Sequence, residues 1–132
     1  MKFRVIQGFY ALCCTLLITS VVSIVGCGDR PSYSNVDVET FSELIRSDNV
    51  TLLDVRTEEE FEKGHIEGAM LIDFRDSAFC ERAINLLNPK DTIAVYCWSG
   101  GRSSAAAAVL AEEGFCVVNL KGGYKKFSNT TH

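Results

Sequence analysis

One cysteine stands where the chain can make a reactive thiolate. Cys97 follows an apolar run, and Arg102 comes five positions later, with Gly100 and Gly101 between them. The glycines accept positive φ without steric cost, so the backbone can curl and direct several N–H groups at one point. A helix beginning after this loop adds positive potential at its N-terminus. The segment 97–102 therefore predicts an anion-binding loop that lowers the pKa of Cys97 and favours the nucleophilic thiolate.

The residues around this loop alternate between predicted strands and helices. Short apolar runs predict buried strands at residues 50–55, 69–72, 92–96 and 115–120. Helical spacing and end signals predict helices at 38–46, from a Thr57–Glu60 capping box to Gly64, and at 77–87, 103–113 and 124–127. This alternation predicts an α/β fold with a mainly parallel central sheet and helices on both faces. Ligands bind at the carboxyl ends of strands in such folds, and Cys97 follows a strand that we expect at the centre of the sheet.

Three stretches of the chain together resemble the rhodanese family. They are the segment 53–69, which contains Asp-Val-Arg and Gly-His-Ile, the 97–102 loop, and the Leu-Lys-Gly-Gly turn at 120–123. Their order and spacing match over about residues 36–127. The resemblance implies a single rhodanese-like domain over residues 35–128, followed by a short tail over 129–132.

The resemblance also implies a role for individual residues. Cys97 would be the sulfur-accepting nucleophile, and Arg102 would close the loop as the cation that binds an anionic donor such as thiosulfate. The loop that surrounds the transferred sulfur would consist of Trp98, Ser99, Gly100, Gly101 and Arg102. Asp54 and Arg56 would form a buried polar pair with a structural role, and His65 would be a hydrogen-bonded structural histidine rather than a catalytic base. Trp98 is either a solvent-facing wall of the donor site or a partner contact.

The implied activity is rhodanese-type sulfur transfer. A sulfane sulfur would move from the donor to a thiol or other thiophilic acceptor, such as a redox protein, through a persulfide on Cys97. Related phosphatase and arsenate reductase loops carry one more residue between cysteine and arginine, and the smaller ring here suits a single sulfur atom. A non-catalytic binding or redox-sensing module and a thiol–disulfide protein are alternatives. The intact Cys97 and Arg102 favour the enzyme.

The remaining cysteines receive simpler interpretations. Cys116 alternates with valines in a predicted strand, so we expect a buried core thiol. Cys80 begins a predicted helix and is expected to be more exposed, with a redox role toward Cys97 as the alternative. Neither the histidines nor the cysteines have the paired spacing of a metal site, and no cofactor is expected.

The N-terminal segment predicts export and a membrane tether. Lys2 and Arg4 precede an uncharged stretch from Val5 to Gly28, which is long enough to span a membrane but interrupted by polar residues. The segment 24–27, Ile-Val-Gly-Cys, resembles a bacterial lipobox. That resemblance implies a lipoprotein signal peptide over 1–26, lipid on Cys27 and a short linker through residue 34. An uncleaved anchor is the alternative, and both place the domain outside the cytoplasm, in the periplasm or at the cell surface.

Length and charge narrow the function further. A chain of 132 residues has room for one domain. The net charge of −4 becomes about −6 without the first 26 residues, because Lys2 and Arg4 are lost with them. An acidic domain without a cluster of lysines and arginines is a poor nucleic-acid binder.

Overall fold

A single parallel sheet forms the centre of the domain. The computed structural model describes residues 32–131, so the predicted signal peptide and Cys27 lie outside the described residues. The strands are β1 (Ser34–Val36), β2 (Val50–Asp54), β3 (Met70–Leu71), β4 (Thr92–Tyr96) and β5 (Cys116–Leu120). They pair in the order β1-β5-β4-β2-β3, and all the pairings are parallel. The predicted α/β fold with the Cys97 strand at the centre of the sheet is confirmed.

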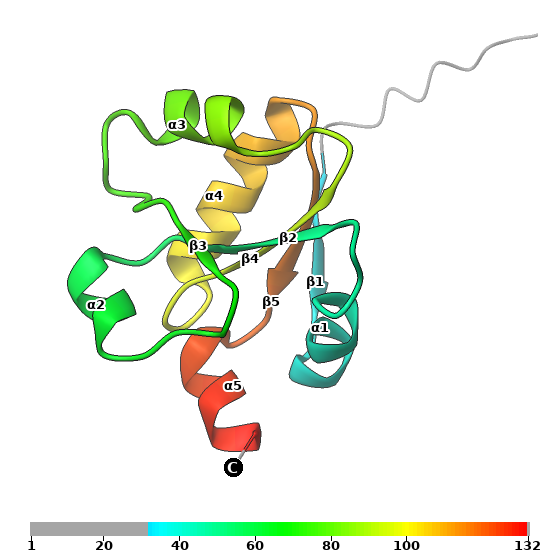
Figure 1. Cartoon of the computed structure of the whole chain (residues 1–132), viewed down its shortest axis with the longest axis vertical. Helices are drawn as coiled ribbons and strands as arrows, with labels where there is room; N and C mark the ends of the chain where they lie inside the picture. The colour runs from blue at the N-terminus through cyan, green and yellow to red at the C-terminus, as the bar shows by residue number, and fades with distance from the viewer. Residues whose placement is uncertain (1–31, 132) are drawn as a thin grey trace, which may run out of the picture. The chain divides into compact units, whose positions relative to one another are not determined.

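Helices cover both faces of this sheet (Figure 1). The helices are α1 (Val38–Leu44), α2 (Glu58–Glu62), α3 (Phe79–Leu86), α4 (Gly101–Glu112) and α5 (Gly123–Thr130). One core cluster holds Phe79 of α3 and Leu110 of α4, and the other holds Phe41 of α1, with Phe127 of α5 packed against it. None of the helices within residues 32–131 is both long and apolar enough to cross a membrane.

Strand β4 shows why its sequence is apolar throughout. Ile93 and Val95 belong to the cluster beneath α3 and α4, whereas Ala94 and Tyr96 belong to the cluster beneath α1 and α5. A central parallel strand is covered on both faces, so it has no solvent-facing side on which to place polar residues. The strand therefore delivers Cys97 to the carboxyl edge of the sheet from a support that is buried from Ile93 to Tyr96.

The observed elements differ from the predicted ones mainly at their ends. Strand β1 was not predicted, because Ser34 and Asn35 are exposed and the strand has no alternation to detect; it pairs along the edge of β5. Helix α4 begins at Gly101, two residues before the predicted start, so Arg102 lies in its first turn. Helix α5 continues to Thr130 rather than ending at residue 127.

The prediction for Cys116 is wrong. Its side chain is exposed, whereas that of Cys80 is partly buried, which reverses the expected order. Cys116 is the first residue of β5, and its Sγ lies 3.8 Å from the Oγ1 of Thr92, the residue that pairs with it at the start of β4. Alternation in β5 ends at its carboxyl end, where the consecutive residues Asn119 and Leu120 are both buried. Cys116 is exposed at the first position of β5, so its place in the apolar sequence of the strand did not predict its burial.

Candidate active site

The Cys97 sulfur lies inside a ring of hydrogen-bond donors. Only 1% of the residue is exposed, and the Gly100 N–H donates to Sγ over 3.1 Å. Gly100 has a φ of +105°, a backbone conformation that favours glycine, at the point where the loop turns into α4. The Ser103 hydroxyl donates to the same atom over 3.4 Å. Ser103 was not predicted as a site residue, although it is the first residue beyond the loop.

These donors stabilise the thiolate. Burial raises the pKa of the Cys97 thiol, but hydrogen bonds from the Ser103 hydroxyl and from the N–H groups of Ser103, Gly100 and Ser99 outweigh burial and lower it. The helix N-terminus and the curled loop were expected to provide several hydrogen-bond donors to a buried anion, and the donors around the Cys97 sulfur agree with that expectation. The same donors can hold the outer sulfur of a persulfide, which is also an anion.

Helix α5 holds the other side of the loop in place. The Tyr124 N–H donates to the Cys97 carbonyl over 2.8 Å, and the Lys125 N–H donates to the Trp98 carbonyl over 3.0 Å. These N–H groups belong to the first turn of α5, where no intrahelical acceptor is available. Gly123 has a φ of +64°, and a Cβ there would lie 2.5 Å from the Trp98 carbonyl oxygen. The Gly-Gly turn is therefore required for α5 to approach the loop.

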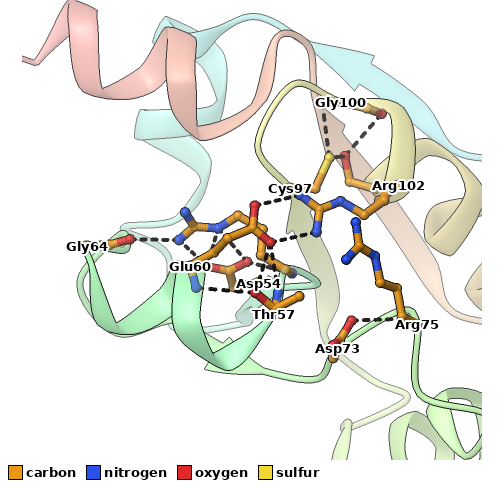
Figure 2. A network of polar contacts seen from close by, with 11 residues as sticks. Asp54, Thr57, Glu60, Gly64, Asp73, Arg75, Cys97, Gly100 and Arg102 are labelled. Atoms are coloured by element: carbon orange, nitrogen blue, oxygen red, sulfur yellow. Dashed lines mark hydrogen bonds and ion pairs between the residues drawn. The ribbon is translucent and has the colours of Figure 1, made fainter.

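Arg102 makes a two-pronged ion pair with Glu60 of α2. Its two terminal nitrogens each lie 2.7 Å from a carboxylate oxygen, with the Arg102 side chain 22% exposed and the Glu60 side chain 31% exposed. The hydrogen bond from Arg102 lowers the pKa of Glu60 to about 2. Figure 2 shows the guanidinium turned toward Glu60. Donor binding by Arg102 stays a prediction, and any donor that it binds must share the guanidinium with this carboxylate.

Sequence reasoning did not identify Glu60 as a site residue. The sequence contains one signal for Glu60, the capping box at Thr57 and Glu60. In this box the Glu60 carboxylate accepts a hydrogen bond from the Thr57 N–H over 3.1 Å. The sequence shows that this side chain folds back over its own helix. It does not show that the helix start meets Arg102, because that contact joins residues 42 positions apart.

Asp54 and Arg56 form a buried ion pair at the end of β2. Arg56 Nη2 lies 2.7 Å from an Asp54 carboxylate oxygen and also donates to the Gly64 carbonyl over 2.8 Å. The guanidinium carbon lies 4.4 Å from the centroid of the Tyr124 ring. The pair thus connects β2, the end of α2 and helix α5, which agrees with the structural role expected for it.

His65 is held on helix α2. Its Nδ1 lies 2.9 Å from the Phe61 carbonyl oxygen, and its ring stacks on the Phe61 ring with centroids 3.6 Å apart. These contacts agree with a structural histidine, and the role itself stays a prediction. Both contacts are with α2 itself, so the ring helps to close the turn that carries Gly64.

An apolar cavity lies beside the loop. Its volume is about 280 Å³, and it is lined by Arg56, Glu60, Lys63, Gly64, Trp98 and Tyr124. Trp98 is 45% exposed and forms one wall, with its ring 6.2 Å from that of Tyr124. Trp98 directly follows Cys97, and Glu60 binds Arg102, so two of the cavity's walls also belong to the surroundings of the loop.

Comparison with known proteins identifies the family. Residues 37–130 match the Rhodanese-like domain model. "Thiosulfate sulfurtransferase 18" of Arabidopsis thaliana is 37% identical over 102 residues, covering 68% of this chain and 74% of its own. "Thiosulfate sulfurtransferase GlpE" of Pseudomonas fluorescens is 32% identical, with 67% of this chain and 80% of its own covered. These names support sulfur transfer as the general chemistry of the chain.

A solved structure agrees with this assignment. The crystal structure of a rhodanese-related protein from Thermoplasma volcanium superposes with a TM-score of 0.67 at 26% identity, over 76% of this chain and 95% of that one. The family match extends from the residue before α1 to the last residue of α5. The chain therefore belongs to the rhodanese-like domain family.

Proposed function

We propose that the domain is a sulfurtransferase that carries sulfane sulfur on Cys97. The observation that carries the proposal is the Cys97 sulfur itself, which accepts hydrogen bonds from the Gly100 N–H and the Ser103 hydroxyl. Donors that converge on a buried sulfur favour the thiolate, which is the form that attacks a sulfane sulfur. An anionic donor such as thiosulfate supplies the sulfur, and a thiol or another thiophilic acceptor receives it.

The reaction divides into two half-reactions. The Cys97 thiolate attacks the outer sulfur of thiosulfate, the S–S bond of the donor breaks, and sulfite leaves with the electron pair of that bond. The product is a Cys97 persulfide anion, whose outer sulfur is held by the loop amides. An acceptor thiolate then attacks this outer sulfur, takes it away as a new persulfide, and releases the Cys97 thiolate. No electrons enter or leave the system.

Mass spectrometry of the intact domain tests this proposal. After thiosulfate treatment we expect one added sulfur, about 32 Da, on Cys97, because a single covalent intermediate forms. Cys97→Ser abolishes the addition, since a hydroxyl at neutral pH is a far weaker nucleophile than a thiolate. Cys80→Ser and Cys116→Ala are matched controls that load normally. Sulfur on Cys80 or Cys116 with Cys97 unmodified refutes the mechanism, and no uptake by the folded domain favours a non-catalytic binding or redox-sensing module.

We also propose that the domain is tethered to a membrane outside the cytoplasm by lipid on Cys27. The support is the sequence alone: a positive start, an uncharged segment and the Ile-Val-Gly-Cys lipobox pattern at 24–27. A tether of this kind keeps the enzyme at the membrane surface while donor and acceptor diffuse to it. Its partners are then a small anionic sulfur compound and an acceptor in the same compartment.

A further inference from the structure

Arg75 is a second cation beside the active-site loop. Figure 2 shows its guanidinium next to that of Arg102 and turned away from Asp73, whose carboxylate accepts only the Arg75 backbone N–H, over 2.9 Å. The other acid of this segment, Asp76, is bound by Arg82 instead. In the part of the chain that the structure describes, the Arg75 guanidinium makes no salt bridge and no hydrogen bond. Its donors are therefore free to bind a ligand.

The segment that carries Arg75 is fixed to the end of β2. The Phe74 N–H donates to the carbonyl of Val55, the residue directly after β2, over 3.2 Å. The Phe74 ring packs against the core and meets the Phe79 ring edge to face, with centroids 5.1 Å apart. The backbone at Arg75 is therefore held at the carboxyl edge of the sheet, the same edge from which the Cys97 loop leaves β4.

Two guanidinium groups side by side favour an anion that contacts both. Like charges repel each other at short range, and an anion bound between them offsets that repulsion. Arg102 donates one N–H from each terminal nitrogen to Glu60, so its other N–H groups remain available. The hydrogen bond with Glu60 first, and more weakly the charge of Cys97, raise the pKa of Arg102 although burial lowers it. An anion held by the two arginines therefore lies within electrostatic reach of the reacting sulfur.

We infer that Arg75 is a further catalytic residue, which binds the oxygens of the donor together with Arg102 and stabilises the leaving group. The inference rests on the proposed function. When the Cys97 thiolate takes the outer sulfur of thiosulfate, the S–S bond breaks and sulfite leaves with the bonding electrons. One thiolate and one thiosulfate give one persulfide anion and one sulfite dianion, so atoms and charge balance. Arg75 supplies this dianion with a positive charge that no carboxylate of the described residues already binds.

Two measurements on the full chain test the inference. The first is steady-state sulfur transfer from thiosulfate to cyanide by the wild-type protein, Arg75→Gln, Arg75→Lys and Arg46→Gln. Arg46 is exposed just beyond α1, so Arg46→Gln is the control for the loss of one positive charge away from the loop. The second needs no turnover: sulfate, an unreactive dianion, should slow the alkylation of Cys97 by iodoacetamide when it binds beside the sulfur. Potassium chloride at equal ionic strength is the reference.

We expect Arg75→Gln to lower kcat/KM for thiosulfate about three- to tenfold and to weaken protection by sulfate by a similar factor, because one of two cations is lost. Arg75→Lys should restore part of both, since an ammonium keeps the charge without the fork of N–H groups. Arg46→Gln should change neither. Without sulfate, the pH profile of Cys97 alkylation should stay in place in Arg75→Gln, because the donors that lower the pKa of the thiol belong to Gly100 and Ser103.

Three results would overturn the inference. The first is unchanged kinetics and unchanged sulfate protection in Arg75→Gln. The second is an equal loss in Arg46→Gln, which would assign the effect to overall charge. The third is a Cys97 pH profile moved upward in Arg75→Gln, which would mean that Arg75 acts on the thiol. A folded wild-type protein that sulfate protects but that takes no sulfur from thiosulfate refutes the proposed function instead, and supports the anion site. Thermal unfolding establishes that each variant is folded.

Discussion

The reactivity of Cys97 depends on a few donors whose positions are known. Its sulfur accepts hydrogen bonds from Gly100 and Ser103, and these lower the pKa of the thiol although burial opposes them. Cys80 provides an internal contrast. Burial first, and then the nearby Glu113 carboxylate, raise the pKa of the Cys80 thiol. The structure therefore lowers the pKa of Cys97 and raises the pKa of Cys80.

The pH dependence of alkylation should separate these two thiols. A group whose pKa is lowered reaches its full thiolate fraction at a lower pH, so the iodoacetamide rate of Cys97 should level off below the pH at which that of Cys80 does. Peptide mass spectrometry measures each cysteine separately, and each rate is normalised to its own plateau because Cys97 is the more buried. Ser103→Ala should move the Cys97 profile to higher pH and leave the Cys80 profile in place. Coincident profiles in the wild-type protein would contradict the proposed stabilisation of the thiolate.

Helix α5 is the element that fixes the shape of the active-site loop. Its first turn donates to the carbonyls of Cys97 and Trp98, and Gly123 makes that approach sterically possible. Both Gly123 and Gly114 have positive φ, at +64° and +92°. They differ in their surroundings, because a Cβ on Gly114 would meet nothing within 4 Å. Alanine at each position thus separates the cost of backbone strain from the cost of a clash.

Gly123→Ala should damage both stability and sulfur loading. Each alanine places a side chain at positive φ, which costs about 1 kcal/mol of the free energy of unfolding. At Gly123 the collision with the loop carbonyls adds about 1–3 kcal/mol more. Urea denaturation measures the difference, and persulfide formation on Cys97 should slow in Gly123→Ala only. Equal effects of the two substitutions on stability and loading would show that α5 does not hold the loop.

The elements were predictable from the sequence where burial imposed a pattern. Strand β4 is covered on both faces and reads as a continuous apolar run, and the capping box at Thr57 and Glu60 marked the start of α2. Strand β1 was missed because an exposed edge strand of three residues needs only backbone pairing with β5. The contacts of Cys97 with Ser103, and of Arg102 with Glu60, depend on how the loop and α2 are placed in space. Local patterns do not contain that information.

At the scale of the whole molecule, the parallel sheet brings three distant segments to one edge. The residues after β2, the loop after β4 and the turn after β5 all follow the carboxyl ends of neighbouring strands, and Figure 1 shows the loop before α4 between α2 and α5. These three segments are the stretches of sequence that resemble the rhodanese family, because ligands bind at the carboxyl ends of the strands in such folds. Arg56, buried against Asp54 and beneath Tyr124, joins the first segment to the third.

The proposed tether would set the compartment in which the domain meets its substrates, and Cys27 is the residue on which that proposal depends. A lipoprotein signal is cleaved directly before a cysteine that carries lipid, so Cys27→Ala should block both lipid attachment and processing. We expect the variant to accumulate in the membrane fraction as a precursor longer by about 26 residues, the segment before Cys27. Labelling with a radioactive fatty acid in a bacterial host, followed by mass measurement, detects both changes.

The matched control is Cys14→Ala, which changes a cysteine in the same uncharged segment. This variant should be processed and labelled normally. A Cys27→Ala protein that is still shortened and labelled would mean that the lipid lies elsewhere. A wild-type protein that keeps its full length without label would favour the uncleaved anchor.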